Sequence, residues 1–96
     1  MPKFVIERNV PGAGQFTAEQ LRAASRKSVD VLCKLGTEIQ WIHSYVAGDK
    51  IYCIYLAATE ELIKEHARLA GFPADRITRI DTDEQQVWTL ERDALS

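Results

Sequence analysis

The sequence predicts an α+β domain of the ferredoxin-like type, with the element order β-α-β-β-α-β over residues 1–80. Two stretches with helical apolar spacing each follow a threonine and end before a glycine. Four short strand-like stretches surround them, and a Gly-Asp turn joins the middle two. Right-handed crossovers then place both helices on one face of a four-stranded antiparallel sheet.

The first strand and first helix come from residues 3–35. In KFVIER, residues 3–8, Phe4 and Ile6 share one face of a strand and Val5 lies on the other. After a Pro/Gly loop, TAEQ fits a capping box, with Thr17 as the N-cap and Gln20 at the third helical position. Apolar residues recur at helical spacing from there to residue 35, and a glycine at position 36 ends the helix.

The stretch IQWIHSYVAGDKIYCIYLA, residues 39–57, predicts a β-hairpin. Its turn would place Tyr45 opposite Tyr52, His43 opposite Ile54, and Trp41 opposite Leu56. These residues would share one face of the sheet. Both faces of the hairpin are largely apolar or aromatic, and one layer of helices covers only one of them. We therefore expect a homodimer in which a partner's sheet covers the second face.

The rest of the chain predicts a second helix, a fourth strand and a tail. Thr59 caps the helix, whose first turn carries two glutamates, and a glycine at position 71 ends it. Residues 76–80, RITRI, suit the fourth strand. The tail, residues 81–96, is acidic and polar apart from Val87, Trp88 and Leu90, and is either an arm that wraps a partner or a disordered end.

Composition excludes several function classes. The net charge of −2 over 96 residues gives no basic surface for nucleic acid. No stretch approaches the ~20 apolar residues of a membrane span, and the N-terminus lacks a signal-peptide pattern, so we expect a cytoplasmic protein. Cys33 and Cys53 have no C-x-x-C spacing and are expected to be free, buried thiols.

The hairpin and the second helix carry a pattern that resembles a known family. The pattern W-x-H-S-Y-V…D-K-x-Y-C-x-Y…E-H-A…G-F-P, from Trp41 to Pro73, is similar to that of short bacterial domains of unknown function, the DUF4242 type. The resemblance spans residues 3 to 80. It implies a ferredoxin-like fold and a dimer, and some members of the family are described as nickel-binding.

The two histidines are the candidate metal ligands, because neutral imidazole suits nickel, zinc and copper. His43 and His66 are expected at similar heights along the sheet but roughly 10 Å apart laterally, which favours separate sites or a site completed by a partner. Glu61 and Glu65 are possible carboxylate ligands. His66 and the glutamates also have structural interpretations. His66 borders the buried stripe of its helix, and the glutamates fit a solvated, ion-paired helix face.

Three functions remain open from the sequence. The first is a small cytoplasmic protein that binds a divalent metal, nickel above all, for sequestration, delivery or sensing, through His43, His66 and Glu61 or Glu65. The second is a dimeric α/β-barrel enzyme or binder of a small molecule. Its aromatic pocket would be formed by Trp41, His43, Tyr45 and Tyr52. The third is an interaction module with structural histidines. No catalytic residue is assigned, and the non-enzymatic hypotheses are preferred.

Overall fold

The computed structural model describes residues 1–84 as a single sheet with two helices. The predicted order of elements is confirmed, and both helices begin and end where their caps predicted. The prediction for Val87, Trp88 and Leu90 lies outside the described residues. The elements are β1 Lys3–Asn9, a 3-10 turn η1 Ala13–Gln15, α1 Ala18–Leu35, β2 Ile39–Ala47, β3 Lys50–Ala57, α2 Glu60–Ala70 and β4 Arg76–Ile80.

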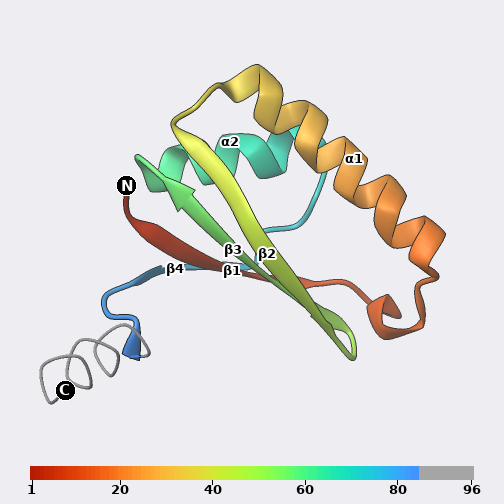
Figure 1. Cartoon of the computed structure of the whole chain (residues 1–96). Helices are drawn as coiled ribbons and strands as arrows, with labels where there is room; N and C mark the ends of the chain where they lie inside the picture. Colours follow the sequence, from red (N-terminus) through yellow and green to blue (C-terminus); the bar gives the residue numbers. More distant parts are fainter. Residues whose placement is uncertain (85–96) are drawn as a thin grey trace, which may run out of the picture.

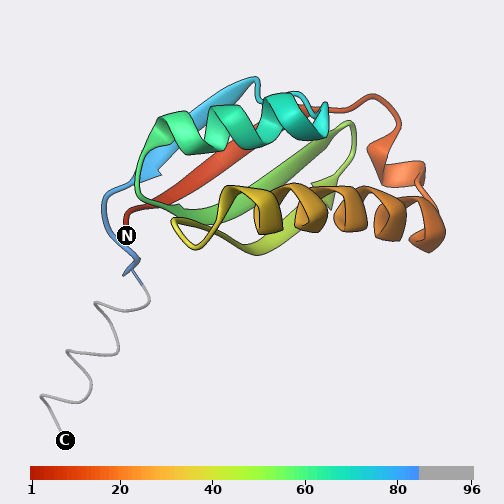
Figure 2. The same ribbon diagram turned by 90° about the horizontal axis from the view of Figure 1, so that it is seen from above.

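The four strands form one antiparallel sheet in the order β2-β3-β1-β4. Both helices lie on the same face of this sheet (Figure 1). Seen from above, α1 follows the β2 side and α2 follows the β1 and β4 side (Figure 2). The predicted ferredoxin-like fold class is therefore confirmed, and within residues 1–84 the opposite face of the sheet carries no helix.

Threonine caps fix the start of each helix. The Thr17 backbone N–H donates to Gln20 Oε1 over 2.9 Å, and the Gln20 backbone N–H donates to Thr17 Oγ1 over 3.1 Å, which completes the predicted capping box. Thr59 Oγ1 accepts from the Leu62 backbone N–H at the start of α2. Gly71 ends α2 at φ 74°, a left-handed conformation that favours glycine.

The core lies between the sheet and the helices. Its side chains come from every second position of β1 and β3, from the start of β2 and from the inner face of α2. The fully or nearly buried apolar members are Phe4, Ile6, Ile39, Cys53, Tyr55, Ala57 and Ile63. Cys53 is buried and free as predicted, whereas Cys33 is free but exposed, which corrects the prediction of two buried thiols.

A β-bulge in β2 overturns one predicted pairing. His43 lies opposite Ile54 and Tyr45 opposite Tyr52 as predicted, but the register shifts between Trp41 and His43. Trp41 therefore pairs with Tyr55 instead of Leu56. Because the bulge inserts one extra residue into β2, the alternation of side chains is interrupted there, and Trp41 joins the helix-covered face. The prediction that it shares a face with His43 was wrong.

The loop between β1 and α1 is attached to the β2–β3 turn. The Val10 N–H donates to the Asp49 carbonyl over 2.8 Å, and the Gly14 N–H donates to the Gly48 carbonyl over 2.7 Å. A Cβ at Gly14 would lie 3.1 Å from that Gly48 oxygen, so glycine permits the close approach. This attachment positions the segment that leads into α1.

No helix within residues 1–84 is long and apolar enough to cross a membrane.

Loss of the α1 cap should measurably destabilise the domain. We expect Thr17→Ala to lower the free energy of unfolding by about 1 kcal/mol, because it leaves the Gln20 N–H without its acceptor. For a domain of this size that corresponds to a Tm lower by roughly 4–8 °C. Thermal unfolding followed by circular dichroism measures the change. Thr37→Ala, an exposed threonine outside both caps, is the control, and an equal loss in both variants would contradict the assignment.

Candidate functional site

His43 lies on the face of the sheet opposite the helices, which we call the open face. Its pairing partner Ile54 and the next residue across the sheet, Val5, share that face. The imidazole is exposed and meets the edge of the Tyr45 ring, with ring centroids 5.0 Å apart. An exposed imidazole beside a tyrosine is accessible to a ligand from solvent.

The open face carries apolar side chains together with charges of both signs. One row across the strands runs from Tyr45 through Tyr52 and Glu7 to Arg76. Tyr45 is 61% exposed, although it is a large aromatic residue. Glu7 accepts a hydrogen bond from Lys50 Nζ over 2.5 Å, and this bond raises the pKa of Lys50. The open face is therefore a mixed surface with an aromatic edge and a paired carboxylate near its centre.

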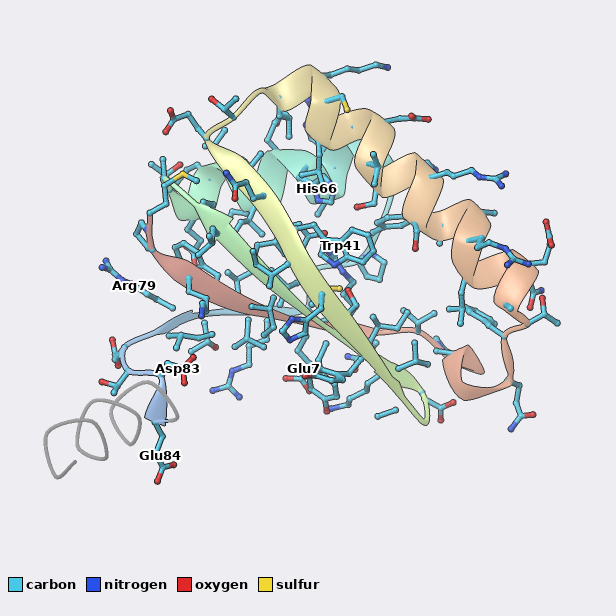
Figure 3. The ribbon with its side chains drawn as sticks, viewed as in Figure 1. Glu7, Trp41, His66, Arg79, Asp83 and Glu84 are labelled. Carbon is cyan, nitrogen blue, oxygen red and sulfur yellow. The ribbon has the colours of Figure 1, made fainter. Side chains whose placement is uncertain are left out.

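His66 lies on the other side of the sheet, in the core between α1 and α2 (Figure 3). The side chain has no exposed surface, and its Nε2 is 3.1 Å from Ser28 Oγ and 3.3 Å from the Ser28 carbonyl oxygen. Because a carbonyl only accepts, Nε2 carries the proton and Nδ1 is the unprotonated nitrogen. Burial is the main cause that lowers the pKa of His66, so the neutral form persists in the folded protein.

The two candidate carboxylates lie on α2, away from His43. Glu65 accepts hydrogen bonds from Arg68 Nε and Nη2, and this pairing lowers the pKa of Glu65. Glu61 is exposed in the first turn of the helix. The four predicted metal ligands are thus divided between the open face, the core and the surface of α2. Within residues 1–84, no three His, Cys, Asp or Glu side chains come together to hold a metal ion.

A cavity of about 190 Å³ lies between α1 and the helix-covered face of the sheet. Of the four residues predicted to form an aromatic pocket, it is lined by Trp41 alone, since His43, Tyr45 and Tyr52 belong to the open face. Figure 3 places Trp41 between the sheet and α1, with Glu7 on the other side of the strands. Most of the cavity wall is apolar or aromatic, and it includes Phe16, Leu21 and Phe72.

Arg8 is the charged residue in the wall of this cavity, and our sequence analysis did not identify it. Its side chain is buried, and Nη1 donates to the Pro73 carbonyl over 2.5 Å. The sequence does hold a signal for it. Arg8 follows Phe4 and Ile6 at alternate positions of one strand, so the period of two assigns it to the core face.

This arrangement defines a ferredoxin-like domain with a cavity that opens to solvent on its covered face and an exposed histidine on its open face. A family model described as "nickel responsive protein SCO4226-like" matches residues 4–80, so the chain belongs to that family. The predicted resemblance to a small ferredoxin-like family is confirmed at this level, while the DUF4242 designation stays a prediction. No curated protein matches the chain.

A solved structure supports the same fold. The crystal structure of SCO4226 from Streptomyces coelicolor A3(2) superposes with a TM-score of 0.71 at 21% identity. The match covers 84% of this chain and 98% of that one. At this identity the similarity establishes the shared fold.

Burial of His66 should make stability depend on pH. Since the pKa of His66 is below its ordinary value of 6.5 in the folded protein, the unfolded chain binds the proton more readily. The stabilisation that neutral His66 contributes is complete above the pKa that this histidine has in the unfolded chain. It decreases as the pH falls from there to the pKa of His66 in the folded protein. We expect the Tm to fall as the pH is lowered from about 7.5 through 6.5 toward the folded-state pKa, measured by differential scanning calorimetry.

Matched histidine variants isolate this effect. His66→Gln retains a group that can bond to Ser28 but does not titrate, and should flatten the pH dependence. His43→Gln should leave the dependence in place. The same slope in His66→Gln as in the unmodified protein would contradict the assignment.

Proposed function

We propose that the protein binds a divalent metal ion, nickel before zinc or copper, at an interface between two copies of the chain. His43 is the ligand that each copy contributes. Binding would serve sequestration, delivery or sensing in the cytoplasm, without catalytic turnover. The observation that carries the proposal is the exposed His43 imidazole on a sheet face with no helix above it within residues 1–84. The description of the family as nickel responsive supports the choice of metal.

A second copy is needed because one copy offers too few ligands. A metal site in a protein uses three or more donors, and His43 has no second imidazole, thiol or free carboxylate beside it in its row of the sheet. Glu7 is on the same face but is paired with Lys50. Two open faces packed together would bring two imidazoles to one interface, and water would complete the coordination of the metal ion.

The composition of the open face supports a second copy as its partner. Val5, Ile54 and Leu56 form a half-buried apolar centre, next to the exposed Tyr45. The face also carries Glu7 together with basic residues on β1, β3 and β4, Lys3, Lys50 and Arg76. A surface with both signs of charge can be complementary to itself across a two-fold axis, as homodimer interfaces require.

The remaining predicted ligands are better explained by structural roles. The protonated nitrogen of His66 is occupied by Ser28, and the ring has no access to solvent. Glu65 is paired with Arg68 on the surface of α2, and Glu61 lies in the first turn of α2, where a carboxylate stabilises the helix N-terminus. The proposed site therefore excludes His66, Glu61 and Glu65 and keeps His43.

Metal titration tests the ligand assignment. Tag-free, metal-stripped protein is titrated with nickel, zinc and copper by calorimetry, since a histidine tag would itself bind all three. We expect one nickel per two chains, with affinity at least about tenfold weaker in His43→Ala, because imidazole is the principal donor. His66→Gln is the matched control and should bind as the unmodified protein does. Unchanged affinity in His43→Ala would refute the proposal.

A charge placed on the open face tests the dimer. We expect Ile54→Asp to convert the protein to a monomer and to abolish nickel binding, because it buries a carboxylate at the centre of the interface. Light scattering after size exclusion gives the mass. Val29→Asp puts the same charge on an exposed apolar position of α1, 42% exposed, and should leave the dimer intact. A monomeric unmodified protein that still binds nickel would contradict the shared site.

A further inference from the structure

Arg8 is a buried cation with an unused hydrogen-bond donor. Arg8 is 3% exposed. Its Nη1 donates to the Pro73 carbonyl, whereas Nη2 has no hydrogen-bond partner within residues 1–84. The guanidinium also lies over the Phe72 ring, with 5.8 Å from Cζ to the ring centroid. The Tyr55 side chain is a further hydrogen-bond partner of Arg8. Nη2 still has no partner within residues 1–84, although guanidinium carries five N–H bonds.

Within residues 1–84, no acidic side chain compensates this charge. The cavity that Arg8 lines has neither aspartate nor glutamate in its wall, and Arg8 forms no ion pair within the described part of the chain. Lys27 Nζ lies 5.9 Å from the centroid of the same Phe72 ring, so a second cation is close to this end of the cavity. The wall around Arg8 therefore carries no negative charge, although its neighbours include the Pro73 carbonyl and the Tyr55 side chain.

Arginine cannot relieve this situation by releasing its proton. His66 shares the same core and is kept neutral by burial, with the charge of Arg8 acting in the same direction. Guanidinium remains charged at any pH that the protein experiences. An uncompensated buried charge is destabilising, so an anion that enters the cavity would gain a charge-assisted, two-pronged hydrogen bond.

We propose that the cavity between α1 and the sheet binds a small organic carboxylate, with the carboxylate on Arg8 and an apolar body against the aromatic wall. The carboxylate suits the fork of N–H groups on a guanidinium. The wall beyond Arg8 is formed by apolar groups that include Phe16, Leu21, Trp41 and Ile51, which favours a hydrocarbon body over inorganic phosphate.

The volume limits the ligand to about one ring. The cavity measures about 190 Å³, and an apolar cavity of about 150 Å³ is enough to hold benzene. Benzoate is therefore a probe of suitable size. The Trp41 indole N–H already donates to Ser44 Oγ over 2.9 Å, and Arg8 is the cationic donor in the wall.

NMR titration with benzoate tests the proposal on the full-length protein. The indole N–H signal of Trp41 reports on the cavity, and a Trp88→Phe variant assigns it, because these are the two tryptophans of the chain. We expect saturable shifts of the Trp41 signal with benzoate. Benzamide, which has the same shape without the charge, should bind roughly 10- to 100-fold more weakly, as should benzoate to Arg8→Met.

Two further variants separate a ligand site from a structural arginine. Ala24→Phe keeps Arg8 but fills the cavity from α1, and should abolish benzoate binding. Arg8→Met, without ligand, should have a Tm equal to or above that of the unmodified protein, because it removes an uncompensated charge. No shift with benzoate at roughly 10 mM, equal binding of benzamide, or an Arg8→Met protein that is less stable would each overturn the proposal. A response to inorganic phosphate equal to that for benzoate would refute the organic specificity.

The proposal is independent of the metal site. The cavity lies on the covered face and His43 on the open face, so His43→Ala should leave benzoate binding unchanged. Failure of the nickel titration would therefore not affect the result with benzoate.

Discussion

The structure depends on one constraint, which is that both helices cover the same face of a four-stranded sheet. The side chains of β1 and β3 alternate, so about every second residue of these strands enters the core and the others meet the open face. Phe4 and Ile6 are buried under the helices, while Val5 between them is on the open face. The division produces two separate environments, one suited to enclosing a small molecule and one to meeting another surface.

Much of this division could be predicted from the sequence, because it rests on local signals. Both helices begin after a threonine cap and end before a glycine, as marked by Thr17 with Gln20, Thr59, Gly36 and Gly71. The Gly48–Asp49 turn sets the first pairs of the hairpin. The bulge could not be predicted in this way. Strict alternation from the turn assigns Trp41 to the open face, and only the extra residue between Trp41 and His43 moves it to the cavity.

The candidate site could be predicted only in part, since it depends on contacts between distant segments. His43 is on the expected face opposite the expected residue. The environment of Arg8, by contrast, is formed by residues far along the chain, among them Pro73 and Phe72. The alternation of β1 assigns Arg8 to the core face, but arginine is mostly exposed in proteins, and the partners that bury it come from segments far along the chain.

Strand β3 contributes residues to both environments, because its side chains alternate between the covered face and the open face. Ile54 faces the open side and pairs with His43, while its neighbour Tyr55 is 2% exposed and lines the cavity. Adjacent residues of one strand thus serve surfaces about one sheet thickness apart. Substitutions at Ile54 and at Arg8 do not share a contact, and effects at sites without shared partners are usually additive. A change in metal binding caused by a carboxylate in the cavity would therefore require movement of β3 itself, which couples both faces through a single backbone.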